Sequence, residues 1–138
     1  MTYLPDPSQP QQPSSLYEIV GEDVFQRLIH EFYVRMRSDD LIGPMYPDDD
    51  WEGAEERLRW FLIQYWGGPA EFSARRGHPR LRMRHARFAI TPEAAKRWVE
   101  IMNAAMETFE ETALPPVARS AIREHAQRVA HMLINQPE

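Results

Sequence analysis

The stretch MYPDDDWEGAEERLRWFLIQYWGGP, residues 45–69, has the pattern of one amphipathic helix between two turns. Its apolar residues recur every three or four positions, which is the spacing of a single helix face. This face carries Trp51, Ala54, Leu58, Phe61, Leu62 and Tyr65. Three aspartates at 48–50 precede it, where the positive end of a helix dipole favours acidic residues. Two glycines and a proline at 67–69 end it.

The segments on either side of this helix show the same period. A capping box of Ser15 and Glu18 predicts a short helix, and apolar residues from Asp23 to Met36 predict a long one. After the central helix, another helix starts at Thr91-Pro92 and carries Trp98 on its inner face. The last helix follows residues 115–116. No strand-like alternation persists. The sequence therefore predicts an all-α fold with about four substantial helices and several short ones.

Composition and charge narrow the class of protein. A chain of 138 residues predicts one domain; four prolines and three glutamines mark residues 1–14 as a flexible tail, which leaves 15–138 as the domain. The absence of cysteine excludes disulfides, iron–sulfur clusters and a cysteine nucleophile. The net charge of −5 argues against general nucleic-acid binding. No apolar run could span a membrane and no signal peptide is visible, so we expect a cytoplasmic protein without membrane contact.

The segment RRGHPRLRMRHAR, residues 75–87, departs from this acidic background. It holds six arginines, and no acidic residue occurs between Glu71 and Glu93. Arginine suits carboxylates and phosphates because its guanidinium donates two parallel hydrogen bonds. The segment therefore indicates recognition of an anion, or else a solvated loop that pairs with the acidic helices. We expect residues 70–91 to form a loop with a short helical turn near 80–86.

Histidines and aromatic residues supply the remaining candidates for chemistry. Five histidines occur, but neither an HExxH motif nor another convincing ligand spacing predicts a zinc site. No glycine-rich phosphate loop or GxSxG motif is present. Tyr33, Tyr46 and Trp98 lie on or beside apolar faces, and buried phenol and indole groups need partners. They could converge on a polar guest in an apolar cavity, or be ordinary core aromatics.

Two motifs carry a resemblance to a known family. Residues 45–69 and the stretch RGHPRLRMRHARFAI, residues 76–90, resemble the truncated haemoglobins of the second group, which are known from actinobacteria and other bacteria. The similarity extends from Leu16 to Glu138 and is ungapped from Tyr33 through Trp98. It implies a truncated globin fold, a two-over-two helical sandwich around one haem b.

The resemblance also implies a role for particular residues. His85, in the RMRH motif, matches the proximal iron ligand of the family, and Arg57 and Arg84 match positions that contact the haem propionates. The implied distal ligand pocket comprises Tyr33, Tyr46, Ala54, Leu58 and Trp98. The implied haem contacts are Tyr46, Arg57, Leu58, Phe61, Leu81, Arg84, His85, Phe88, Trp98 and Met102.

Three functions follow as hypotheses. The first is binding of O2 and other small ligands such as NO, CO, peroxide or sulfide at ferrous haem; donors that slow release favour sensing, scavenging or redox chemistry over bulk oxygen transport. The second is a haem-dependent redox enzyme, a nitric-oxide dioxygenase or a weak peroxidase. The third is an arginine-rich nucleic-acid-binding module without haem. A reductase as partner and a homodimer stay open at this point.

Overall fold

A computed structural model describes residues 15–136, and the predicted tail at 1–14 lies outside this range. The described residues form helices and no strands, which confirms the predicted all-α class. The elements are α1 (Leu16–Val20), α2 (Glu22–Arg37), the 3-10 helix η1 (Gly43–Met45), α3 (Trp51–Tyr65), α4 (Glu71–Arg76), α5 (Leu81–Arg84), α6 (Pro92–Met106) and α7 (Pro116–Leu133). No described helix is both long and apolar enough to cross a bilayer.

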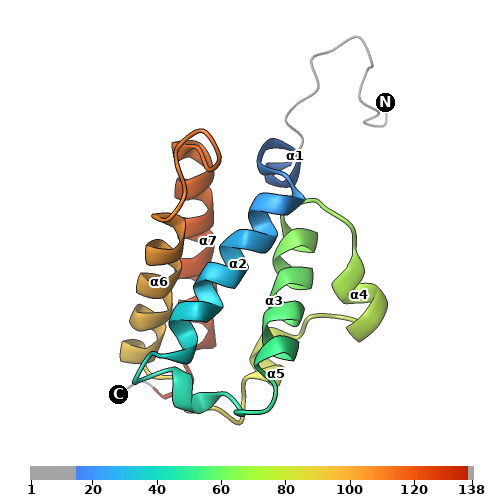
Figure 1. Cartoon of the computed structure of the whole chain (residues 1–138). Coiled ribbons are helices and arrows are strands. Elements are labelled where there is room, and N and C mark those ends of the chain that lie inside the picture. The colour runs from blue at the N-terminus through green and yellow to red at the C-terminus, as the bar shows by residue number, and fades with distance from the viewer. Residues whose placement is uncertain (1–14, 137–138) are drawn as a thin grey trace.

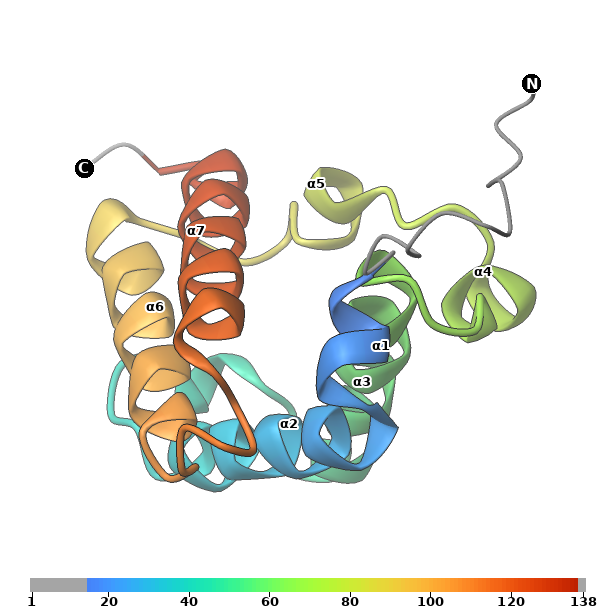
Figure 2. The ribbon, with the colours of Figure 1, turned by 90° about the horizontal axis from the view of Figure 1, so that it is seen from above.

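The four long helices are arranged as two pairs. Helix α2 packs against α3 on one side and against α6 on the other, and α6 lies alongside α7 (Figure 1). Seen from above, α6 and α7 stand on one side and α3 on the other, with the short helix α5 between them (Figure 2). This arrangement is the predicted two-over-two sandwich.

The core lies where α2 packs against α3 on one side and against α6, the neighbour of α7, on the other. Phe25, Leu28, Ile29, Phe32 and Met36 form one face of α2 and are almost completely buried. They share a single apolar cluster with residues of α3, α6 and α7. Burying one such side chain contributes roughly 1.5–3 kcal/mol, so the spacing seen in the sequence accounts for the place of α2 at the centre.

The region at 70–91 contains more helix than the sequence predicts. The sequence predicts a helical turn near 80–86, where α5 lies, but it does not predict α4. Helix α4 buries only Phe72, so it shows no apolar periodicity. It is held instead by Gln64 of α3, which accepts a hydrogen bond from the Ser73 backbone N–H at 2.9 Å and donates one to the Ser73 hydroxyl at 2.8 Å. The position of α4 therefore depends on a polar side chain of α3 and not on apolar residues of its own.

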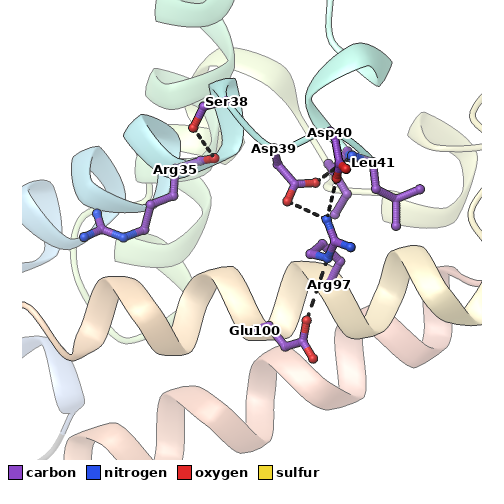
Figure 3. Close-up of polar contacts among 8 residues, drawn as sticks. Arg35, Ser38, Asp39, Asp40, Leu41, Arg97 and Glu100 are labelled. Carbon is purple, nitrogen blue, oxygen red and sulfur yellow. Dashed lines mark hydrogen bonds and ion pairs between the residues drawn. The ribbon is translucent and has the colours of Figure 1, made fainter.

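The corner after α2 is tied to α6 by Arg97 (Figure 3). One guanidinium nitrogen of Arg97 donates to Asp39 at 2.8 Å and to Asp40 at 2.9 Å. The Asp39 carboxylate also accepts the backbone N–H groups of Leu41 and Ile42, at 3.0 and 2.8 Å. Asp39 therefore satisfies two backbone donors of the turn and links that turn to the second helix pair.

We expect Asp39→Ala to lower the free energy of unfolding by about 1–2 kcal/mol, because both backbone donors lose their acceptor. Partial burial raises the pKa of Asp39, but hydrogen bonds from the Ile42 N–H and from Arg97 lower it by more. A lowered folded-state pKa means that the stabilisation is complete above pH ~4 and disappears as the pH falls below that value. Urea denaturation between pH 7 and pH 3 measures both effects.

Asp40→Ala is the matched control, because the Asp40 side chain is 91% exposed and, among residues 15–136, binds Arg97 alone. We expect it to change the free energy of unfolding by less than about 0.5 kcal/mol. Equal losses in the two variants would show that the ion pair with Arg97, rather than the turn, accounts for the role of Asp39.

Candidate functional site

A cavity of about 450 Å³ is lined mainly by residues of α3, α4, α7 and the segment around His85, together with Trp98 of α6. A smaller cavity of about 120 Å³ shares six of its residues, namely Tyr46, His85, Phe88, Trp98, Val129 and Leu133. The sequence-predicted residues that line the larger cavity are Tyr33, Tyr46, Ala54, Arg57, Leu58, Phe61, Arg84, His85, Phe88 and Trp98. Residues more than sixty positions apart in the chain therefore meet at one site.

Two of the predicted haem contacts lie elsewhere. Met102 is 1% exposed, packs in the apolar core and lines neither cavity. Leu81 is also absent from both linings, but its carbonyl oxygen contacts His85 directly.

His85 directly follows α5 and is half-buried at the cavity. Its Nδ1 lies 2.7 Å from the carbonyl oxygen of Leu81. A carbonyl can only accept, so Nδ1 carries a proton, and in the neutral imidazole Nε2 then keeps a free lone pair. No cluster of three or more histidine, aspartate or glutamate side chains suited to a metal occurs in residues 15–136. The arrangement therefore presents one oriented imidazole to the cavity.

The segment around His85 is anchored at both ends. Asn135 donates to the carbonyl oxygen of Phe88 at 2.9 Å and accepts from the Ile90 N–H at 2.9 Å, which ties the segment to the chain beyond α7. On the other side, Arg84 donates to the carbonyl oxygens of Pro79, Arg76 and His78 at 2.6, 2.9 and 3.2 Å. These contacts use Nε and Nη2 of Arg84 and leave Nη1 for another acceptor.

Arg57 of α3 lies at the same cavity and pairs with Asp50 at 2.8 Å. Gly53 makes room for this pair, because a Cβ at that position would collide with the Asp50 carboxylate. As with Arg84, part of the Arg57 guanidinium stays available. Both predicted propionate contacts therefore border the cavity while also holding local structure.

Tyr33 and Tyr46 meet edge to face, with ring centroids 5.9 Å apart. Burial raises the pKa of Tyr33 well above 10, and the neighbouring Tyr46 raises it further. Burial also raises the pKa of Tyr46, although a hydrogen bond with Tyr33 partly opposes this shift. Both phenols therefore keep their protons at neutral pH and remain potential donors.

Trp98 of α6 lines both cavities and packs edge to face on Phe32, with centroids 5.2 Å apart. Among residues 15–136 its indole N–H has no hydrogen-bond acceptor. Ala54 of α3 is 6% exposed and lines the larger cavity with a methyl group alone. The polar groups of this part of the cavity thus come from Trp98 and the two tyrosines.

Sequence reasoning missed several residues of the cavity. The missed residues are Pro47, Asp50, Leu62, Phe72, Arg76, Arg87, His125, Val129 and Leu133. The arginines belong to the segment that the sequence marked as unusual, so their charge was a usable signal. Val129 and Leu133 carried the apolar period of α7, but that period does not say which other helix they face.

His125 is the least expected member of this set. It is 6% exposed, lies on α7, and stacks on Tyr65 of α3 with ring centroids 3.9 Å apart. Burial lowers the pKa of His125 to about 4, and the positive charge of Arg128 adds to the effect. The imidazole is therefore neutral at pH 7, and its stack with Tyr65 joins α7 to α3 at one end of the cavity.

Comparison with known proteins agrees with this fold. The sequence model of the bacterial-like globin family matches residues 15–135. The chain is 36% identical over 122 residues to Group 2 truncated hemoglobin YjbI of Bacillus subtilis, covering 88% of this chain and 89% of that protein. The thermostable haemoglobin of the actinobacterium Thermobifida fusca matches in structure with a TM-score of 0.82 and 46% identity, over 90% of this chain and 99% of that one. The truncated oxygen-avid haemoglobin of Bacillus subtilis gives 0.80 and 34%, over 88% and 99%.

The fold and these relatives thus define an all-α protein of the haem-binding globin class. The chain belongs to the bacterial-like globin family. Its relatives include group 2 truncated haemoglobins, which confirms the predicted resemblance and the truncated globin fold. Membership of the family implies that the protein binds haem and diatomic ligands such as O2.

The lowered pKa of His125 predicts a pH-dependent loss of stability. The unfolded chain takes up a proton near pH 6.5, whereas the folded protein resists it until about pH 4. The free energy of unfolding should therefore be unaffected by this group above pH ~6.5 and fall between that value and pH ~4. His125→Phe keeps a ring against Tyr65 but removes the titration, so between pH 7 and 4.5 it should lose about 1–3 kcal/mol less than wild type.

The control is His131→Gln, because His131 is exposed on the same helix and should leave the pH dependence unchanged. Thermal or urea denaturation across the pH range provides the measurement. Parallel curves for wild type and His125→Phe would show that protonation of His125 does not lower the free energy of unfolding.

Proposed function

We propose that this protein binds haem b through Nε2 of His85 and takes up O2 and other diatomic ligands at the iron. The observation that carries the proposal is the 2.7 Å hydrogen bond from Nδ1 of His85 to the Leu81 carbonyl oxygen. A histidine that ligates a metal commonly donates its other N–H in this way, which sets both the tautomer and the ring orientation. The lone pair is thereby directed away from the backbone and is free for iron.

The other residues of the cavity fit the chemistry of haem. Leu58, Phe61 and Phe88 give the cavity apolar walls that suit a porphyrin face and exclude water. Arg57 and Arg84 border it with guanidinium groups that can hold the two carboxylates of haem. Bound haem would supply a ferrous iron that takes a diatomic ligand reversibly.

Trp98, Tyr33 and Tyr46 are the proposed ligand-stabilising groups. The Trp98 indole can donate but not accept, so it favours a ligand with negative charge on its outer atom. The tyrosines can donate or accept and can exchange partners with each other when the ligand changes. The similarity to a haemoglobin described as oxygen-avid supports strong retention of O2, since preorganised donors slow its release.

Replacing His85 by alanine should abolish iron ligation by the protein, leaving no haem or only weakly held haem. The visible absorption spectrum of the purified ferrous protein measures this directly. His78→Ala is the control, because His78 is exposed and outside the cavity, and it should keep the wild-type spectrum. A normal five-coordinate ferrous spectrum in His85→Ala would remove His85 from the proposal.

Trp98→Phe tests the proposed donor, because it keeps an aromatic ring against Phe32 and deletes the N–H. A hydrogen bond to a charged group contributes ~1.5–3 kcal/mol, so O2 dissociation should become roughly tenfold faster or more. CO has less charge on its outer atom and should dissociate at a nearly unchanged rate. Stopped-flow measurement of both off-rates separates the outcomes: an equal change for both ligands indicates altered access, and no change for O2 excludes the donor role.

A further inference from the structure

The arginine-rich segment forms a positive surface beside the cavity. We call the exposed residues Arg75, Arg76, Arg80, Arg82 and Arg87 the arginine face. Arg76 and Arg87 also line the cavity, so this face borders the cavity mouth. No acidic residue occurs between positions 71 and 93 to neutralise it within the segment.

The members of the arginine face differ in how they are held. Arg75 pairs with Glu71 at 2.7 Å and lies over the ring of Trp60. Arg80 and Arg82, in contrast, have no hydrogen-bond or ion-pair partner for their side chains anywhere in the described part of the chain. Met83, next to Arg82, is 59% exposed. Two unpaired guanidinium groups and an exposed apolar side chain therefore stand together on α5 and the residue before it.

The positive charges also repel one another. Burial lowers the pKa of Arg76, and the charges of Arg84 and Arg57 lower it further. Bound haem carboxylates would offset the charges at the cavity edge, namely those of Arg57 and Arg84. They would leave Arg80 and Arg82, which do not line the cavity, without a counter-charge.

We propose that the arginine face docks an acidic one-electron carrier protein, which delivers an electron to the haem at the cavity mouth. The inference rests on the proposed haem site, since the electron must pass to iron there. In the transfer the carrier loses one electron and ferric iron gains it, and no bond forms or breaks. Complementary charge would speed the encounter, and the exposed Met83 would add apolar contact at the centre of the interface.

A compact acidic protein fits this surface better than a nucleic acid or an anionic membrane. Those polyanions extend well beyond a small patch, and the chain as a whole carries a net charge of −5. Asp50 lies at the same cavity, and Asp48, Asp49 and Glu52 continue from it on the exposed surface. These acids would repel an extended polyanion but leave room for a partner of limited size.

The experiment uses the full-length haem-loaded protein with a reduced acidic flavodoxin as the probe. Formation of the ferrous protein is followed in a stopped-flow instrument under CO, at low and high ionic strength. Arg80→Gln/Arg82→Gln should reduce the rate at least about threefold at low salt, and the difference should vanish near 0.5 M salt. The control Arg27→Gln/Arg123→Gln changes net charge equally at residues outside the cavity and should reduce the rate by less.

Two further measurements separate the possible failures. The CO spectrum reports the haem site alone. A double variant with the wild-type CO spectrum but slower reduction supports docking. If the wild-type protein itself shows no haem–CO spectrum, the haem proposal is contradicted instead. Binding of the flavodoxin to each protein by titration calorimetry gives a readout that does not depend on iron. Equal losses of reduction rate and flavodoxin binding in both double variants, or no loss in either, would overturn the proposal. The proposal would also be overturned if Arg80→Gln/Arg82→Gln weakened binding to anionic vesicles or to an oligonucleotide but left binding to flavodoxin unchanged.

Discussion

The hydrogen bond between His85 and the Leu81 carbonyl is the contact on which the site depends. It spans one turn of a helix that has only four residues, so α5 cannot hold the imidazole by its own stability. The stability comes from outside the turn. Arg84 binds three carbonyl oxygens at the end of α4 and in the loop that follows it, and Asn135 binds the backbone after His85. The orientation of a single ring thus depends on residues up to fifty positions away.

The space in front of His85 exists because the two helix pairs are held together at α2 and kept apart elsewhere. Helix α2 packs on both α3 and α6, and its fully buried face serves as the shared base. Away from that base, the contact between α3 and α7 runs through side chains, with His125 stacked on Tyr65. A neutral imidazole suits this position because it can be buried at lower free-energy cost than a charged one.

The parts of the fold that could be predicted from sequence are those in which the apolar period reports burial directly. Helices α2 and α6 bury most of the face that the spacing indicates. Helices α3 and α7 do so only in part, because Tyr65 is 48% exposed and Val129 and Leu133 line the cavity. Helix α4 could not be predicted in this way, because it buries only Phe72 and is held by Gln64 of α3. For the site, ten predicted residues line the cavity, whereas Met102 lies in the core. Trp98 and Met102 share one face of α6, and only the tertiary packing decides which of them reaches the cavity.

The arginine-rich segment shows why charge alone left its function open. Within a few residues of one another, Arg84 supports a loop, Arg76 borders the cavity and Arg82 faces solvent without a partner. In the sequence all three count equally as one positive charge. In the structure the first satisfies backbone carbonyls, the second suits a ligand carboxylate and the third is free for a partner. Because each guanidinium has five donors, one arginine can also serve two of these purposes at once, as Arg84 does when it uses Nε and Nη2 and keeps Nη1 free. The roles are therefore separated by position in the fold rather than by residue type.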